Sequence, residues 1–276
     1  MIKIIVDNGS GEEVTAKIHS LITQMPQTFF LPQSSNLGLA AALDLGVRNL
    51  SNIAPDCELI LFLDQDSEPL GGAIERLCTA LMELEQSGKN PGAVGPQLQD
   101  VDTGLYHGFH QMTCWRWRRI FPEPSEHLPI PVSNLNGSGT LMRRAVYERL
   151  RGLDTDLFID HVDTEWAFRL LANGYTLWGV PDAVFKHRMG QRGLRFWMLG
   201  WRVWPARSPA RHRYLYRNAL WLIQRPYVPQ VWKFWAVVKL LLTALVHGLA
   251  DPRRFAQLAA MWQGVREGLH HATLKR

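Results

Sequence analysis

Apolar and polar positions follow two different periods along the first 185 residues. Short, continuous apolar runs predict buried strands, most clearly at residues 2–6 and 58–63. Weaker strand patterns occur at 92–95, 138–142 and 175–180. Apolar residues that recur every three or four positions predict helices over 37–50 and 70–86. A polar helix is expected over 11–23, and a helix from Val162 is expected to end at Asn173 and Gly174. Strands that alternate with helices are typical of an α/β sheet domain.

The pattern changes after His187. Tryptophans and a leucine recur at helical spacing at Leu194, Trp197, Trp201 and Trp204, and this stripe fits helix packing and a membrane surface equally well. Another helix is expected over 211–224. Residues 231–250 are nearly all apolar, but two lysines and a histidine interrupt them, so a membrane-spanning helix is not predicted.

A last amphipathic helix is expected behind Asp251 and Pro252, which resemble an N-cap followed by an N1 proline. Its apolar stripe consists of Phe255, Leu258, Trp262, Val265 and Leu269.

Composition adds a division of charge to this picture. The 276 residues carry a net charge of +5, but residues 1–185 hold 13 Lys and Arg against 23 Asp and Glu. Residues 186–276 hold 17 against 2, together with seven of the 11 tryptophans. An acidic part is therefore joined to a basic, Trp-rich part, which indicates an anionic surface as partner. Three cysteines without paired spacing suit a reducing compartment, and the strand pattern directly after Met1 predicts no signal peptide.

Asp64 and Asp66 carry the strongest local indication of chemistry. They follow the apolar run 58–63, and ligands of open α/β sheets bind beyond the carboxyl ends of strands. Two carboxylates there could hold Mg²⁺ or Mn²⁺, which in turn binds a diphosphate. A solvated acidic turn would have the same sequence.

Two further candidates each have a structural alternative. Residues 160–165 place three carboxylates at a helix start, which suits either the helix dipole or a general base. His187 ends a strand-like run and is either a hydrogen-bonded, half-buried residue or, beside Asp64 and Asp66, a third metal ligand.

Residues 115–119 alternate tryptophan and arginine. Such a segment could stack on nucleic acid, but an edge strand with one wet face has the same alternation. The acidic composition around it argues against a nucleic-acid partner.

Taken in order, these segments resemble glycosyltransferase family 2 and, within it, the bacterial rhamnosyltransferases. The matching stretches are residues 6–10, 36–42, 61–67, 94–96, 137–144, 152–154, 157–166, 174–175, 180–187, 216–218 and 264–268. The resemblance implies a GT-A fold, Rossmann-like with a mostly parallel sheet, over residues 1–190. Residues 191–276 would form a helical extension at the membrane surface or on the acceptor side.

The resemblance also assigns roles to residues. It implies that Asp64, Asp66 and His187 hold a divalent cation, Mg²⁺ or Mn²⁺, against the donor diphosphate. Asp163 would be the catalytic base, ionised at neutral pH because it lies at a helix N-terminus. Donor-binding residues are expected to be Asp7, Asp64 and Arg217. Residues expected to support the site or to lie on its acceptor side are Glu165, Trp166 and Ser138.

One departure from the family concerns its first strand. This chain starts at what resembles the family's second strand, and the absent strand would lie inside the sheet. Two functions follow: an inverting transferase that moves L-rhamnose from a dTDP-rhamnose-like donor to a lipid-linked saccharide acceptor, or a catalytically impaired, membrane-associated subunit. Either would lie in the cytoplasm, peripheral on an anionic inner membrane face.

Overall fold

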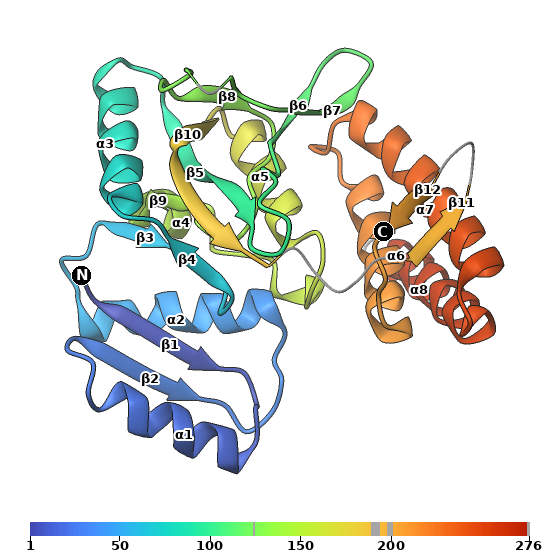
Figure 1. Cartoon of the computed structure of the whole chain (residues 1–276), viewed down its shortest axis with the longest axis horizontal. Coiled ribbons are helices and arrows are strands. Elements are labelled where there is room, and N and C mark those ends of the chain that lie inside the picture. The colour runs from blue at the N-terminus through green and yellow to red at the C-terminus, as the bar shows by residue number, and fades with distance from the viewer. Residues whose placement is uncertain (124, 189–193, 198–200, 275–276) are drawn as a thin grey trace.

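The computed structural model describes residues 1–123, 125–188, 194–197 and 201–274. Figure 1 shows a small N-terminal α/β unit, a larger sheet flanked by helices, and a group of C-terminal helices. The α/β prediction is therefore confirmed.

The helices follow the predicted periodicity closely. They are α1 (Glu12–Ile22), α2 (Leu39–Ile53), α3 (Ala73–Gln86), α4 (Arg144–Arg149), α5 (Val162–Ala172), α6 (Pro209–Gln224), α7 (Gln230–Ala250) and α8 (Arg254–Leu274), with a 3-10 helix at Thr155–Leu157. The strands are β1 (Lys3–Asp7), β2 (Thr28–Pro32), β3 (Leu59–Leu61), β4 (Ser67–Pro69), β5 (Pro91–Asp100), β6 (Phe109–Met112), β7 (Trp117–Ile120), β8 (Ile130–Val132), β9 (Leu141–Arg143), β10 (Thr176–His187), β11 (Leu194–Trp197) and β12 (Trp201–Trp204).

The main sheet has the order β3-β9-β5-β10-β4, with β8 also paired to β10. Strand β10 runs parallel to β5, and both β3 and β5 are antiparallel to β9, so β3, β5 and β10 share one direction. Helix α3 packs on one face through a cluster that includes Leu77 and Leu81. Helices α2 and α5 pack in a second cluster, which includes Val47 and Phe168. Together they give the layered arrangement that an α/β domain needs to bury both faces of its sheet.

Strands β1 and β2 form a separate, parallel two-stranded sheet. Among the described strands, none connects β1 to β3, the end strand of the main sheet. This is the place where the sequence predicted an absent strand. Helix α2 holds the two sheets together, because its Val47 lies in the main core while its Gly46 faces Ile4 and Val6 of β1.

The Trp stripe after residue 193 is not a helix, and that prediction was wrong. Residues 194–197 and 201–204 form the antiparallel pair β11–β12. Aromatic and β-branched residues favour strands, and over so short a segment the helical spacing did not outweigh that preference. The predicted domain boundary at 190/191 lies outside the described residues.

Helix α8 forms as predicted, and its apolar stripe is divided: Val265 packs against the protein, whereas other members are exposed. Phe255 is 77% exposed and Trp262 is 64% exposed. The packed side instead contains Gly264 and Gly268, where a Cβ would meet the Arg213 carbonyl and Leu220 of α6. Small residues allow the two helices to approach closely, and this contact decides which face of α8 is buried.

The alternating tryptophans and arginines of residues 115–119 belong to the hairpin β6–β7, as the edge-strand alternative predicted. Trp117 stacks on His110 with ring centroids 5.4 Å apart and meets the edge of Phe168, whereas Trp115 is exposed. Within β7, Trp117 and Ile120 are half-buried and the two arginines between them are exposed, while Trp115 lies before the strand.

Candidate active site

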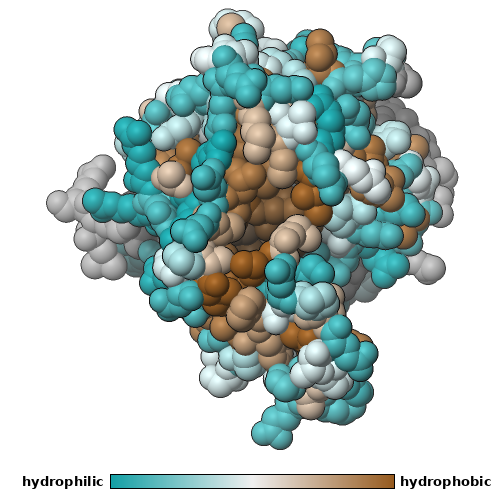
Figure 2. All heavy atoms as spheres, turned by 90° about the vertical axis from the view of Figure 1, so that its left-hand side faces the viewer, coloured by the Kyte–Doolittle hydropathy of each residue, from teal (hydrophilic) through white to brown (hydrophobic). Residues whose placement is uncertain are grey.

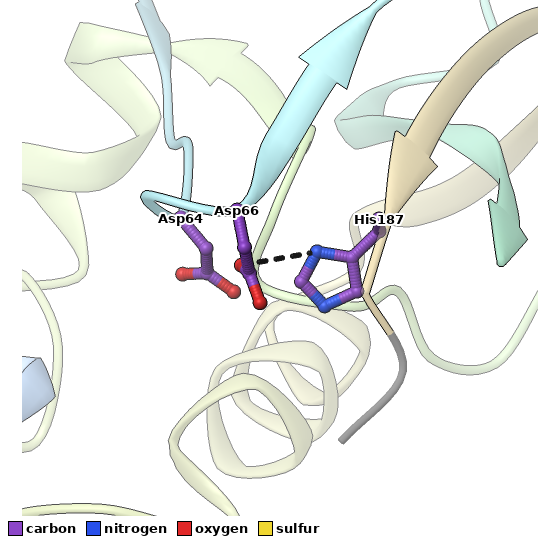
Figure 3. A group of neighbouring side chains, drawn as sticks. All are labelled: Asp64, Asp66 and His187. Atoms are coloured by element: carbon purple, nitrogen blue, oxygen red, sulfur yellow. Dashed lines mark ion pairs between the residues drawn. The ribbon is translucent and has the colours of Figure 1, made fainter. Parts of the chain in front are cut away.

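Asp64, Asp66 and His187 lie together at one edge of the main sheet. One ligand atom from each lies within 4.8 Å of the others, and among the described residues this is the group that could hold a metal ion. Figure 3 shows the two carboxylates in the turn between β3 and β4, with the imidazole at the end of β10 pointing toward them. Strand β4 pairs with β10 so that Ser67 lies opposite His187, which brings residues 120 positions apart into one site.

Serine hydroxyls hold this turn in place. Ser67 Oγ is 2.7 Å from His187 Nδ1, and Ser138 Oγ donates to Ser67 Oγ at 2.5 Å. Ser138 Oγ also accepts the backbone N–H of Asp64 at 3.1 Å, which supports the predicted supporting role of Ser138. Outer hydrogen bonds of this kind orient metal ligands.

The two aspartates and the histidine form a donor set that fits a divalent cation. Burial raises the pKa of Asp64, Asp66 raises it further, and the charges of His187 and Arg211 lower it. Two carboxylates close together repel each other, and a cation between them removes that cost. Carboxylate oxygens suit Mg²⁺ and Mn²⁺, and an imidazole nitrogen is an additional ligand that Mn²⁺ accepts.

Asp7 lies at the end of β1, and its carboxylate already has partners. Ser10 N donates to Oδ1 at 3.2 Å and Thr15 Oγ1 donates to Oδ2 at 2.6 Å. The hydrogen bond from Ser10 lowers the pKa of Asp7 most strongly, so the group is ionised. It shapes the turn after β1, and its contact with a nucleotide stays a prediction.

Asp163 lies at the start of α5, after a loop of unusual backbone geometry. Phe158, Asp160 and His161 have φ values of 63°, 61° and 65°. Non-glycine residues in this region are strained, and such strain concentrates at functional sites. Asp163 Oδ1 accepts the N–H of Thr164 at 2.8 Å.

The pKa of Asp163 is shifted in the opposite direction to the one that the sequence suggested. The helix N-terminus was expected to keep the carboxylate ionised, but burial raises its pKa to about 6, and Asp160 raises it as well. Desolvation therefore outweighs the hydrogen bond from Thr164. A base whose pKa is near 6 is still mostly ionised at neutral pH and is better matched to proton transfer than a free aspartate.

Glu165 and Trp166 are part of the supporting structure. Glu165 is 1% exposed and binds Arg169 through both oxygens, at 2.9 and 2.7 Å. Tyr227 also donates to it at 2.6 Å. Trp166 packs in the core with its ring 5.4 Å from Tyr147.

Arg217 and Asn218 lie on α6, and both hold the strained loop before Asp163 in place. Arg217 Nη2 donates to the carbonyl of Asp156 at 2.8 Å, and its guanidinium lies over the Trp221 ring. The fully buried Asn218 Nδ2 approaches three carbonyl oxygens of this loop, those of Leu157 at 2.6 Å, Ile159 at 2.7 Å and Asp160 at 3.0 Å. These contacts hold the loop, and phosphate binding by Arg217 stays a prediction.

Removing the Asn218 amide is expected to destabilise the protein by about 1–3 kcal/mol, since buried carbonyl oxygens lose their donor. Denaturant unfolding of Asn218→Ala would measure this. Asn49→Ala is the matched control because it removes one bond within α2, to Leu45 O at 2.9 Å. Equal losses in both variants would show that Asn218 has no special role in the loop.

The sequence reasoning missed Arg207 and Arg211. Arg211 Nε lies 3.1 Å from Asp160 Oδ2, and Arg207 Nη2 lies 3.7 Å from Asp160 Oδ1. The positive charge of Arg211 also lowers the pKa of Asp64. The sequence did contain a signal for Arg211. This arginine lies in the first turn of α6, where the helix dipole disfavours a positive charge unless an acidic residue from elsewhere lies close to it.

Comparisons with known proteins show the family to which this chain belongs. The model of the family described as "Glycosyl transferase family 2" matches residues 3–151, more than half of the chain. The chain belongs to glycosyl transferase family 2, and it is a glycosyltransferase by fold and family. It is 28% identical over 226 residues to the dTDP-rhamnosyl transferase RfbF of Shigella flexneri, covering 82% of this chain and 72% of that protein.

A second relative is the N-acetylglucosaminyl-diphospho-decaprenol L-rhamnosyltransferase of Mycobacterium tuberculosis, 26% identical over 212 residues. That match covers 67% of this chain and 65% of the mycobacterial protein, so the chain spans slightly less than two thirds of it.

Solved structures confirm the GT-A fold. The structure of GalNAc-T7 with UDP, GalNAc and Mn²⁺ superposes with a TM-score of 0.56 at 15% identity, over 98% of this chain and 51% of that one. The structure of S. aureus TarS 1-349 with UDP superposes with a TM-score of 0.50 at 12% identity. This match covers 98% of this chain and 62% of the TarS chain. The chain thus spans about half the length of the first of these structures.

Proposed function

We propose that this protein transfers L-rhamnose from a dTDP-rhamnose-like donor to a lipid-linked saccharide acceptor, with inversion at the anomeric carbon. The observation that carries the proposal is the convergence of Asp64, Asp66 and His187 at one sheet edge of a family 2 chain. The choice of sugar and acceptor rests on the two rhamnosyltransferase relatives.

Asp64, Asp66 and His187 would hold the divalent cation, which when bound offsets the negative charge of the departing nucleoside diphosphate. Asp163 accepts the proton of the acceptor hydroxyl as that oxygen attacks the anomeric carbon. The C–O bond to the sugar forms as the bond to the diphosphate breaks, in one displacement that inverts the configuration. Arg211, whose charge lowers the pKa of Asp64, would add positive charge that favours the diphosphate.

Incubation with a panel of nucleotide sugars, Mn²⁺ and a lipid-linked N-acetylglucosamine acceptor tests the proposal. We expect release of dTDP from dTDP-rhamnose and an inverted glycosidic linkage in the product. Turnover only with UDP-sugars would refute the rhamnose assignment, and retention of configuration would refute the single displacement.

We further propose that α7 and α8 lie on the anionic inner face of the membrane. Their exposed apolar side chains include Phe234, Leu241, Leu249, Phe255 and Trp262, each more than 60% exposed. The two helices meet where Leu258 of α8 lies near Gly248 of α7.

By length and composition alone, helix α7 could cross a membrane, and only 22% of its most apolar stretch is buried inside the protein. The flanking residues Arg253, Arg254 and Arg266 are exposed and supply positive charge. An exposed apolar face bordered by cations suits an anionic lipid surface.

Replacing three residues of this face, as Leu241→Gln/Leu249→Gln/Phe255→Gln, is expected to lower the vesicle partition coefficient at least about tenfold, because each buried apolar side chain contributes about 1.5–3 kcal/mol. Sedimentation with phosphatidylglycerol vesicles would measure it. Leu21→Gln/Leu105→Gln/Leu128→Gln is the matched control, since these leucines are 65–74% exposed elsewhere. Equal loss in both triple variants would contradict membrane docking through α7 and α8.

A second candidate is a catalytically impaired, membrane-associated subunit. The separation of the β1–β2 sheet from β3 favours it, because it divides the sheet beside the metal-ligand group. Calorimetric titration with dTDP distinguishes the two: an intact donor site binds dTDP in the presence of Mn²⁺, and an impaired one does not.

A further inference from the structure

Helix α7 carries a lysine in the middle of its packed side. Trp232, Thr243 and His247 recur at the spacing of one helix face, and each is no more than 6% exposed. Lys239 lies between them on the same face, yet its side chain is exposed. The inner side of α7 is therefore open to solvent at this position, and an ammonium group occupies the opening.

The hairpin β6–β7 lies against the same helix. Trp235 Nε1 of α7 donates to the Trp115 carbonyl at 3.2 Å, and Figure 1 shows β7 beside α7. Trp117 of the hairpin and Trp232 of α7 both contact the ring of Phe168, with ring centroids 5.8 and 5.6 Å apart. The hairpin and the helix thus share one aromatic contact at their base.

Arg119 extends from this hairpin on the side of Trp117. It lies opposite His110 in the strand pairing, and the His110 ring stacks on Trp117 at 5.4 Å, so the three side chains share a face. Burial lowers the pKa of His110 to about 4, and the charges of Arg119 and Lys239 both contribute to this shift. Two cations from different elements therefore act on one residue.

Neither Arg119 nor Lys239 has an anionic partner. Neither forms an ion pair within the part of the chain that the structure describes, and the remaining residues contain no Asp or Glu. Burial lowers the pKa of both groups, and the charges of Arg207 and Arg119 lower that of Lys239 further. Cations held together in this way repel one another, and an anion among them removes that cost.

These cations lie close to the loop that leads to the predicted base. Trp232, two helical turns before Lys239 on the same face of α7, meets the edge of the His161 ring at 5.5 Å. The charges of Asp160 and Asp163 act on Lys239 and oppose the lowering of its pKa by burial. An anion bound at Lys239 would therefore lie near Asp163.

We propose that Arg119 and Lys239 bind a phosphate group of the acceptor, namely the phosphate or diphosphate ester that joins the acceptor sugar to its lipid. This inference rests on the proposed function. One sugar ring separates an attacking hydroxyl at Asp163 from such an ester, so the anion site has to lie near the base but not on it. The guanidinium can bind two phosphate oxygens at once, and the ammonium adds a compact charge.

Other sources of phosphate suit these two residues less well. The donor diphosphate is assigned to Asp64, Asp66 and His187, where a divalent cation would neutralise it. Membrane headgroups would meet the outer side of α7, whereas Lys239 lies on its inner side. The apolar hollow that Figure 2 shows faces away from α7, and its apolar lining would not attract a phosphate.

Calorimetric titration with two acceptors that differ only in phosphate tests the proposal. One is N-acetylglucosamine joined to a short-chain lipid by a diphosphate, and the other is the glycoside of the same lipid alcohol. Both are presented in neutral detergent, so that no anionic headgroup is present. Arg119→Gln/Lys239→Gln should weaken binding of the diphosphate acceptor at least about 30-fold, because hydrogen bonds between charged groups are strong. Its affinity for the glycoside should change little.

Arg118→Gln/Lys89→Gln is the matched control, because it removes the same two types of side chain. Both residues are exposed; Arg118 donates to Gln111 at 2.8 Å on the other face of β7, and Lys89 lies before β5. This variant should keep its affinity for both acceptors. Arg119→Lys/Lys239→Arg retains both charges and should keep most of the affinity for the diphosphate acceptor.

Four results would overturn the proposal. The first is an equal loss of diphosphate-acceptor binding in Arg119→Gln/Lys239→Gln and in the control, and the second is an equal loss for the two acceptors. The third is weaker binding of dTDP with Mn²⁺, which would assign the cations to the donor. The fourth is loss of binding to phosphatidylglycerol vesicles with unchanged acceptor affinity, which would assign them to a lipid headgroup.

The same acceptors separate this inference from the proposed function. Selective binding of the diphosphate acceptor without transfer of rhamnose would leave the phosphate site standing and refute the proposed reaction. Transfer of rhamnose with equal affinity for the two acceptors would support the reaction and refute the phosphate site.

Discussion

Asp66→Asn is expected to abolish binding of Mn²⁺ and to lower sugar transfer by about 1000-fold. The substitution removes one carboxylate from the group that also contains Asp64 and His187, whose ligand atoms lie within 4.8 Å of one another. A bound cation contributes several kcal/mol of charge stabilisation to a departing diphosphate, and each 1.36 kcal/mol corresponds to a factor of ten.

The measurement is Mn²⁺ titration by calorimetry, followed by the rate of dTDP release. Glu68→Gln is the control because Glu68 lies two residues further along, on the exposed side of β4 opposite Lys186, and is outside the metal-ligand group. It loses the same charge but should retain Mn²⁺ affinity and activity. Unchanged affinity in Asp66→Asn would show that the cation binds elsewhere.

Asp163→Asn is expected to lower the turnover number by a factor of about 10²–10⁴ while leaving dTDP binding unchanged, because a general base contributes that much. In the unsubstituted protein, burial raises the pKa of Asp163 to about 6. Its base form is therefore lost as the pH falls through about 6, and activity should fall tenfold per pH unit below that value. Asp156→Asn, on the 3-10 helix, is the control with the same change of charge and should keep the full rate and the pH profile.

The same substitution should make the protein more stable at neutral pH. Because the pKa of Asp163 is higher in the folded state than its ordinary value of 3.8, this group favours folding only at low pH, and that contribution is lost as the pH rises through about 6. The ionised carboxylate thus costs stability of the order of 3 kcal/mol. Denaturant unfolding at pH 7.5 would measure the gain in Asp163→Asn, and a loss of stability instead would contradict the raised pKa.

Much of this site could be predicted from the sequence because its parts lie next to strong local patterns. The continuous apolar run before Asp64 and Asp66 placed both carboxylates after a strand, and the resemblance supplied His187. Arg207 and Arg211 were missed because their partner Asp160 lies about 50 residues earlier in the chain, and no local period links them.

The sequence alone therefore determined the α/β class, the positions of most helices and the place of Asp64 and Asp66 directly after a strand, since each depends on spacing along a few turns or one strand. The tertiary structure decided what depends on distant neighbours. Pairing placed residues 194–197 and 201–204 of the Trp stripe in strands, and close contact at Gly264 and Gly268 left Phe255 and Trp262 of α8 exposed. Burial raised the pKa of Asp163, and among the described strands β1 and β3 belong to separate sheets, because desolvation and hydrogen bonding are set by what lies across space from a residue.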